Sequence, residues 1–335
     1  MKDIFKKMYS YKELSEQETY NLFNHIIFKK KNNIELTASL IAMKMRGERY
    51  NEILGITRLF LEKSRLFPSP KYKFADIVGT GGDNYNDINI STISSFVASS
   101  LGLKIAKHCN VSITSKSGSS NILKKFNINL NISPKISRFF LDKFNICFLF
   151  APFYHQGFRQ AHPIRKFLNT RTIFNILGPL TNPAKPPFTL IGVYHKKWIN
   201  VIIRILKELK YQRAIVLCSN NTDEVTLFTK TYIAELKNKK INSYVLEPQH
   251  FGLNTFNFNN INEGGKPKKN HEIITKLLQG QGSEFHEQTI AANVALVLKI
   301  FGHENLKENA QNALKIIRSG IVYKKIIKIA QLGKA

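Results

Sequence analysis

The sequence predicts an α/β fold, with a small N-terminal helical domain and a larger domain whose mostly parallel central sheet is flanked by helices. Three observations predict it. Apolar residues recur at helical spacing up to about residue 65, and Pro68 and Pro70 then end this pattern. Beyond them, short β-rich runs alternate with helical stretches. This alternation is typical of a parallel sheet, in which helices connect successive strands.

The N-terminal part predicts three helices. Ser15 and Glu18 have the spacing of a capping box, which satisfies free backbone donors at a helix start. The apolar residues that follow at helical spacing are Leu22, Phe23, Ile26 and Ile27. A second helix runs through Leu36 and Leu40 to end near Gly47, and a third covers residues 52–63. We therefore expect a helical domain at residues 1–70, joined by a helical segment near residues 163–182.

The larger domain is expected to cover residues 71–335. Its predicted strands are residues 74–78, 103–106, 146–150, 190–194, 214–217 and 231–236. Its predicted helices are residues 91–101, 120–126, 198–209, 289–301 and 304–319. The polar stretch 254–270 is expected to form a surface loop, with Gly264-Gly265 as a turn.

Composition narrows the class of protein. With 335 residues, of which 43% are hydrophobic, the chain can bury a substantial core. No apolar run is long enough to span a bilayer, and the first residues do not resemble a secretory signal. Cys109, Cys147 and Cys218 lie far apart, which argues against a disulfide framework or a metal cluster. We expect a cytoplasmic protein.

The net charge of +27 has two explanations. Clustered Lys and Arg would indicate a nucleic-acid partner, because they neutralise phosphates. The excess here is mainly Lys, which is dispersed along the chain and accompanied by many Asn, Ile and Phe residues. An AT-rich genome would encode such a composition. We therefore expect no specific nucleic-acid partner and no membrane partner.

A glycine-rich segment follows the first predicted strand. It reads Asp76-Ile-Val-Gly79-Thr80-Gly81-Gly82-Asp83, and a helix is predicted to begin near Ser91 and Thr92. Glycines allow positive φ and a close approach to a ligand, and the amides of such a turn suit an anion. A tight strand-to-helix turn with ordinary capping explains the segment as well. It lacks the Gly-Lys-Ser/Thr end of a P-loop and the GxGxxG spacing.

Asp223 and Glu224 form an adjacent acidic pair after the apolar run 214–217. Neighbouring side chains of a strand point to opposite faces, so both can serve one site only from a turn or loop. The preceding Asn220-Asn221-Thr222 favours a loop. The pair by itself fits a solvated acidic surface or a magnesium site.

Several motifs together resemble the anthranilate phosphoribosyltransferase family over nearly the whole chain. They are Gly79-Thr80-Gly81-Gly82-Asp83, Asn89-Ile-Ser91-Thr92, Ala106-Lys107-His108-Cys109-Asn110-Val111-Ser112, Ser115-Lys116-Ser117-Gly118-Ser119-Ser120, Phe150-Ala-Pro-Phe-Tyr154-His155, Pro163-Ile-Arg165, the stretch from Thr170 to Pro183, and Asp223-Glu224-Val225. Their order and separations match the family. The resemblance implies transfer of the phosphoribosyl group of phosphoribosyl pyrophosphate (PRPP) to the amine of anthranilate, in tryptophan biosynthesis.

The resemblance also implies a set of site residues. Those expected around PRPP are Gly79, Gly82, Asp83, Asp87, Asn89, Ile90, Ser91, Thr92, Lys107, His108, Cys109, Asn110, Val111, Ser112, Ile113, Thr114, Ser115 and Ser119. Those expected at anthranilate are Gly79, Asn110 and Arg165. Ser91, Asp223 and Glu224 are expected to bind Mg²⁺, with two ions per monomer. The family also implies a homodimer. No glutamine amidotransferase domain is expected in this sequence, so any anthranilate synthase partner would be a separate chain.

The chemistry fits these residue types. Pyrophosphate must leave from the ribose, so the reaction needs charge neutralisation and positioning of two substrates. The neutral aryl amine of anthranilate needs no strong base. Lys107 is a candidate phosphate ligand, although an ordinary surface Lys explains it too, and Arg165 could clamp a carboxylate or form an ion pair. His155 could line the anthranilate pocket, although a structural role is the commoner one.

Two other functions compete. A pyrimidine nucleoside phosphorylase-like enzyme would carry a related glycine loop, but Asn89-Ile-Ser91-Thr92 and the stretch 175–180 argue against it. A nucleic-acid-binding protein on a degenerate transferase fold would explain the charge, but the carboxylates and the glycine loop are intact. The chain departs from its family at Cys109, Val111 and Asp87, where a glycine, an arginine and a small hydroxyl residue are usual, and we expect weaker PRPP binding as a result.

Overall fold

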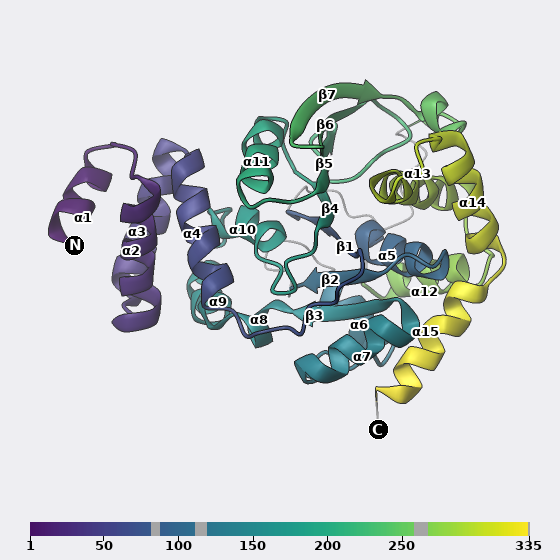
Figure 1. Ribbon diagram of the computed structural model, residues 1–335, viewed down its shortest axis with the longest axis horizontal. Helices are drawn as coiled ribbons and strands as arrows, with labels where there is room; N and C mark the ends of the chain where they lie inside the picture. The colour runs from purple at the N-terminus through teal and green to yellow at the C-terminus, as the bar shows by residue number, and fades with distance from the viewer. Residues whose placement is uncertain (82–87, 111–118, 258–266, 334–335) are drawn as a thin grey trace.

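The fold centres on one sheet of seven strands, in the order β3-β2-β1-β4-β5-β6-β7 (Figure 1). The computed structural model describes residues 1–81, 88–110, 119–257 and 267–333. Strands β1 to β5 pair in parallel, and β6 and β7 pair antiparallel, which confirms the predicted mostly parallel sheet. Their bounds are β1 Ala75–Gly79, β2 Ile105–Cys109, β3 Ile146–Phe150, β4 Phe188–Gly192, β5 Arg213–Ser219, β6 Thr231–Lys237 and β7 Lys240–Leu246.

Helices cover both faces of the sheet, and each face buries its own hydrophobic cluster (Figure 1). Along β5, Ile215 and Leu217 belong to one cluster while Ala214 and Val216 belong to the other, as the period of a strand requires. The helices of the first cluster are α5 Ile90–Ser100, α6 Ser119–Lys125, α7 Pro134–Phe144, α12 Pro267–Leu278, α13 Glu284–Phe301, α14 Leu306–Arg318 and α15 Ile321–Leu332.

The second cluster joins the sheet to the N-terminal helices. These helices are α1 Lys2–Tyr9, α2 Glu16–Phe23, the π-helix η1 Asn24–Lys29, α3 Asn33–Arg46 and α4 Tyr50–Glu62. Four later helices complete this cluster: α8 Ala151–Tyr154, α9 Gln156–Leu168, α10 Phe174–Leu180 and α11 Lys197–Glu208. The capping box of Ser15 and Glu18 is confirmed. Helices that precede the first three strands thus pack together with helices that follow them.

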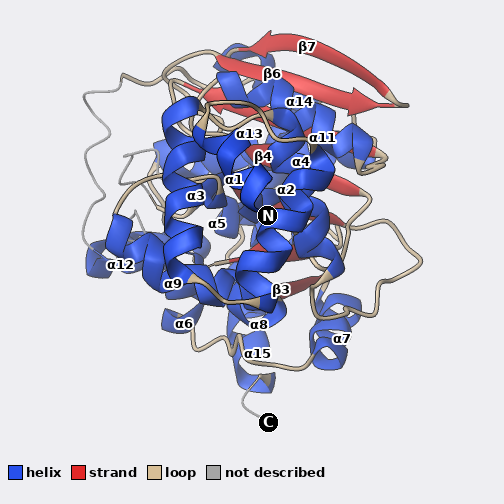
Figure 2. Ribbon diagram, turned by 90° about the vertical axis from the view of Figure 1, so that its left-hand side faces the viewer, coloured by secondary structure: helices blue, strands red, loops and turns tan. Residues whose placement is uncertain are grey.

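Some elements were not predicted, among them α1, α7, α8, α12, α15 and β7. Strand β7 lies at the edge of the sheet, largely exposed, so its sequence lacks an apolar alternation (Figure 2). The prediction of a loop over residues 254–270 was wrong at its end, because helix α12 begins at Pro267. The predicted turn Gly264-Gly265 lies outside the described residues. Within the described chain, no helix is both long and apolar enough to cross a membrane.

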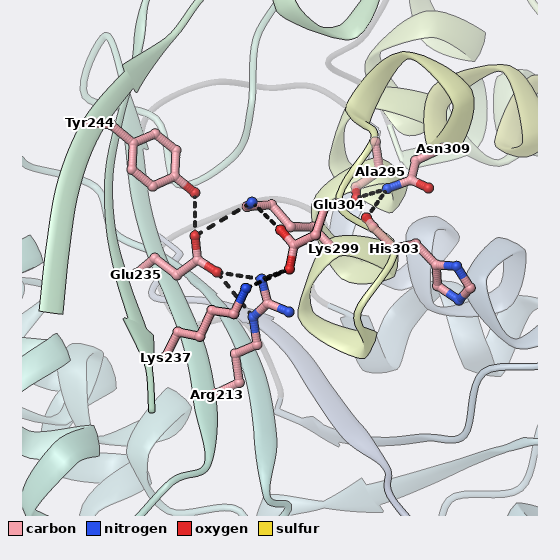
Figure 3. A network of polar contacts seen from close by, with 9 residues as sticks. All are labelled: Arg213, Glu235, Lys237, Tyr244, Ala295, Lys299, His303, Glu304 and Asn309. Carbon is pink, nitrogen blue, oxygen red and sulfur yellow. Dashed lines mark hydrogen bonds and ion pairs between the residues drawn. The ribbon is translucent and has the colours of Figure 1, made fainter. Parts of the chain in front are cut away.

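An ion-pair network ties the antiparallel edge of the sheet to the α13–α14 junction (Figure 3). The buried Arg213 donates to Glu235 Oε1 from Nε at 3.0 Å and from Nη2 at 2.7 Å. Glu304 accepts from Arg213 at 2.9 Å, Lys237 at 2.8 Å and Lys299 at 2.7 Å. Burial opposes its ionisation, but these three donors outweigh that effect and lower the pKa of Glu304 to about 2.

Glu304→Gln should therefore destabilise the protein at neutral pH and reduce its sensitivity to acid. A carboxylate whose pKa is lowered on folding stabilises above its unfolded value, near 4.5, and loses this contribution as the pH falls towards 2. Because the Glu304 side chain is 46% exposed, solvent screening limits the effect to about 1 kcal/mol. Denaturant unfolding between pH 7 and 3 measures it, with the exposed Glu308→Gln as control. Equal acid sensitivity of the wild type and Glu304→Gln would contradict the assignment.

Candidate active site

The candidate site lies at the carboxyl ends of β1 and β4. From β1 the chain adds β2 and β3 on one side of the sheet, and it then adds β4 and β5 on the other side. The strand order therefore reverses between β1 and β4. Ligands of open α/β sheets bind in the crevice at this point. Strands β1 and β4 end side by side, with Gly79 opposite Gly192.

The turn that carries Asp223 packs against both of these glycines. A Cβ at Gly79 would lie 2.1 Å from Asp223 Oδ2, and a Cβ at Gly192 would lie 1.5 Å from the Asp223 carbonyl oxygen. The same Oδ2 accepts a 2.6 Å hydrogen bond from the Gly81 N–H. Gly192 therefore needs glycine because the main chain of the acidic turn occupies the space, whereas at Gly79 the Asp223 side chain occupies it. The Gly81 N–H binds this turn directly.

The acidic pair lies in a turn after β5, as we expected. Asn220 and Asn221 adopt left-handed conformations, and Ser219 and Thr222 exchange backbone hydrogen bonds across this tight turn. Asparagine tolerates positive φ better than most residues. The turn directs Asp223 back over the ends of β1 and β4, and the Asp223 and Glu224 charges both act on the nearby Lys107.

Lys107 is buried, so the alternative of an ordinary surface lysine is wrong. Its Nζ donates to the Ile77 carbonyl and, at 3.1 Å, to Ser91 Oγ. Burial lowers the Lys107 pKa, and Asp76 is the charge that most opposes this shift. The alternative that Ser91 or Thr92 caps α5 is also wrong, because the N-cap is Asn89. The Ser91 hydroxyl instead accepts the hydrogen bond from Lys107 Nζ.

His108, the next residue of β2, points to the opposite face into a cluster of aromatic side chains. Its Nδ1 contacts the Gly178 carbonyl at 2.9 Å, and His155 Nε2 contacts the Thr181 carbonyl at 2.8 Å. The two rings lie 5.3 Å apart. Burial lowers the pKa of His108 to about 4 and that of His155 to about 3, so both are neutral at physiological pH. The Nε2 atom of His108 is buried and lacks a partner within the described chain.

Arg165 from α9 reaches the same aromatic region. Its guanidinium lies 5.5 Å from the centre of the Phe174 ring, which also packs against Phe158. Only 7% of Arg165 is exposed, and burial lowers its pKa to about 10. Among the described residues it has no ion-pair or hydrogen-bond partner. The alternative of a structural ion pair therefore finds no support there, and a buried cation remains available to an anionic ligand.

The other predicted residues divide into three groups. The side chains of Ile90 and Cys109 are buried in the core, so only their main chain could face PRPP. Cys109 ends β2 without a positive φ, and its Sγ donates to the Leu149 carbonyl at 3.6 Å. Asn110 follows β2 and Ser119 begins α6. The residues outside the described chain are Gly82, Asp83, Asp87, Val111, Ser112, Ile113, Thr114 and Ser115.

Two polar residues beside the site were not predicted. Asp76 is 1% exposed, and Asn182 Nδ2 donates to its Oδ2 at 2.8 Å. Burial raises the Asp76 pKa to about 6, against the effects of Lys107 and several hydrogen bonds. The sequence did offer a signal for Asp76, which is an acidic residue within an otherwise apolar strand before the glycine loop. A carboxylate buried in such a strand needs polar partners, so other polar residues are expected beside it.

The match to known families defines the class of protein. Residues 2–64 match the helical bundle domain of a glycosyl transferase family, and residues 71–323 match its a/b domain. The chain therefore combines both domains of this class.

The chain belongs to the anthranilate phosphoribosyltransferase family. The proteins of that name from Buchnera aphidicola subspecies Schizaphis graminum and Baizongia pistaciae are each 54% identical to it, over 100% and 99% of this chain and 99% and 100% of theirs. The crystal structure of anthranilate phosphoribosyltransferase from Thermus thermophilus superposes with a TM-score of 0.90 and 29% identity, covering 99% of this chain and 100% of that one. The Saccharomyces cerevisiae enzyme in complex with PRPP and Mg has a TM-score of 0.87 and 26% identity, covering 98% and 97%.

Gly192→Ala should displace the Asp223 turn and destabilise the fold. The new methyl group would collide with main chain, which cannot move aside as a flexible side chain could. Overpacking of this kind typically costs about 1–3 kcal/mol. Thermal unfolding measures the loss, and Gly178→Ala is the control, since nothing lies within 4 Å of a Cβ built there. A Gly192→Ala protein as stable as Gly178→Ala would contradict the predicted collision.

Proposed function

We propose that this chain transfers the phosphoribosyl group of PRPP to the amine of anthranilate, releasing pyrophosphate in tryptophan biosynthesis. One observation carries the proposal: two chemically different subsites meet at the carboxyl edge of the sheet. On one face Lys107 approaches Ser91 beside the acidic turn, and on the other the buried Arg165 lies among aromatic rings. A highly charged phosphate ester suits the first subsite, and a small aromatic carboxylate suits the second.

The structural relatives support this pairing of substrates. One structure of the Saccharomyces cerevisiae enzyme contains PRPP and Mg, and another contains 4-fluoroanthranilate. This second structure has a TM-score of 0.86 and 25% identity to the present chain. By this likeness, we assign the described residues near Lys107 to PRPP and Arg165, Gly79 and Asn110 to anthranilate. The residues outside the described chain keep their sequence-based assignments.

The residues near the glycine loop fit magnesium. Asp223 and Glu224 offer carboxylate oxygens and Ser91 a hydroxyl, the hard oxygen ligands that Mg²⁺ takes together with substrate phosphates. We propose that these three residues hold it, with two ions per monomer. When bound, Mg²⁺ supplies positive charge that stabilises the departing pyrophosphate. Lys107 lies on the same face. Burial lowers its pKa, whereas Asp76, Glu224 and Asp223 favour its charged form, which would attract phosphate strongly in this buried position.

Arg165 can orient anthranilate through two parallel hydrogen bonds to its carboxylate. Such a clamp fixes the direction of the amine relative to the ribose, which is the positioning that the reaction requires. The neutral His108 and His155 line the same pocket without adding charge, which suits an uncharged aromatic ring. Phe158 and Phe174 complete the apolar wall, and both pack edge-on against Phe60 of the helical domain.

Four further points belong to the proposal. We divide the chain into a helical domain at residues 1–70 and a transferase domain at residues 71–335. We expect a homodimer, for which Ile34 and Met45, 82% and 70% exposed on α3, offer an apolar surface. We place the enzyme in the cytoplasm, where its three buried free cysteines would stay reduced. Anthranilate would come from separate anthranilate synthase chains.

The direct test is an activity assay. Purified protein should consume anthranilate, followed by the loss of its fluorescence, only when PRPP and Mg²⁺ are both present. Nucleoside with phosphate should give no reaction, which would separate this function from that of a nucleoside phosphorylase. No turnover with all three components would refute the proposed function, and undiminished turnover without Mg²⁺ would refute the role of the metal.

Arg165→Ala should weaken anthranilate much more than PRPP. Loss of a charge-assisted hydrogen bond typically costs about 1.5–3 kcal/mol, so the KM for anthranilate should rise about tenfold or more. Arg159→Ala is the matched control, because Arg159 is an exposed arginine of the same helix. If the KM for PRPP alone rises, Arg165 belongs to the phosphate subsite.

Asp223→Asn combined with Glu224→Gln should raise the Mg²⁺ concentration needed for half-maximal rate and lower kcat. The two amides keep the shape of the turn but remove the negative charges that attract a divalent cation. A matched double variant, Asp142→Asn with Glu208→Gln, removes the same two kinds of charge from α7 and α11. Unchanged rates at limiting Mg²⁺ would show that the acidic pair is only a solvated surface.

A further inference from the structure

The ladder between β1 and β2 opens after its first pair. Ala75 pairs with Ile105, and the Ala75 N–H donates to the Lys104 carbonyl at 2.9 Å. Strands β2 and β3, by contrast, pair over five positions, as do β1 and β4. A regular parallel ladder would continue with two bonds, from the Ile77 N–H to the Ala106 carbonyl and from the His108 N–H to the Ile77 carbonyl.

Three side chains take over the groups that this opening leaves free. The Ala106 carbonyl accepts from Asn182 Nδ2 at 2.8 Å. The His108 N–H donates to Asp76 Oδ1 at 3.2 Å, and the Ile77 carbonyl accepts from Lys107 Nζ. The Ile77 N–H is a further donor to the Asp76 carboxylate. Asn182 also donates to Asp76 Oδ2 at 2.8 Å, so the amide bridges the two strands.

We infer that Asp76 and Asn182 are positioning residues that hold β1 and β2 apart and thereby place the Lys107 ammonium for PRPP. If the ladder closed, the His108 N–H would reach the Ile77 carbonyl and compete with Lys107 Nζ for it. The opening is thus what gives Lys107 its place between the strands. This inference rests on the proposed function, because it takes PRPP as the ligand of Lys107.

Stability alone does not account for this arrangement. Closing the ladder would satisfy the same backbone groups with neutral hydrogen bonds. The chain instead buries Asp76 and Lys107, each 1% exposed, and they form no direct ion pair in the described structure. Burying two charges is costly, and a neutral replacement of similar shape is often as stable or more so. Shifted, buried ionisable groups beside a crevice are typical of functional sites.

The test compares two buried asparagines. Asn182 is 1% exposed and binds one backbone carbonyl besides Asp76, whereas Asn309 is 3% exposed and binds the Ala295 and His303 carbonyls away from the site. Each variant, Asn182→Ala and Asn309→Ala, should lower the melting temperature. Only Asn182→Ala should raise the KM for PRPP, by about tenfold, the loss expected for a charge-assisted contact. The KM for anthranilate should change less, because Arg165 lies on another element.

A second measurement observes the opening without substrate. Hydrogen exchange of peptides covering residues 75–79 and 105–109 should change in Asn182→Ala and not in Asn309→Ala. Asp76→Asn should reproduce both effects while keeping the side-chain shape, since an amide must turn a donor towards either His108 N–H or Asn182 Nδ2. If both Asn182→Ala and Asp76→Asn lose stability but keep the wild-type KM for PRPP, the two residues are merely structural. If the exchange of these peptides changes in Asn182→Ala as expected but the wild type has no turnover, the proposed function is refuted instead.

Discussion

The arrangement of the site depends on three side chains replacing main-chain partners between β1 and β2. A parallel sheet that stayed fully paired would bring these strands together up to their carboxyl ends. Asp76, Lys107 and Asn182 allow them to part without leaving buried backbone groups unsatisfied. Each unsatisfied group would cost about 1–3 kcal/mol, so the parting is possible only because these partners are present. The glycine loop follows β1 and Asn110 follows β2, so both start from strands that have moved apart.

The parting also separates two kinds of chemistry. Lys107 and His108 are neighbours in sequence, and the pleat of β2 directs them to opposite faces. Lys107 meets Ser91 on the face covered by α5, whereas His108 packs with His155 among aromatic side chains. Those aromatic side chains, Phe158 and Phe174, belong to the hydrophobic cluster that joins the sheet to the N-terminal helices. A movement of the helical domain would therefore be felt at the pocket that we assign to anthranilate.

Parts of this site could be predicted from the sequence because their cause is local. The acidic pair was expected in a loop, since adjacent side chains of a strand diverge and Asn220-Asn221-Thr222 favours a turn. The glycine-rich loop after β1 was expected as well, but the contact that the structure shows at Gly79 was not. The glycines were expected to allow close approach of a ligand. The structure shows that the loop also approaches the Asp223 carboxylate, which binds the Gly81 N–H although the two residues are 142 positions apart in sequence. Sequence spacing does not reveal such a long-range contact.

The sequence by itself determined the class of fold, the order of most strands and helices, and the motifs that indicate a phosphoribosyl transfer, because hydrophobic periodicity, turn residues and motif spacing are local properties. Burial and partners were decided by the tertiary structure. Lys107 is a lysine like the many others of this basic chain until β1, β2 and α5 enclose it. Asp76 and Asn182 became part of the site only when the fold brought residues 76, 106 and 182 together. The physical reason is that the cost of burying a polar group, and the partner that offsets it, depend on neighbours that only the folded chain supplies.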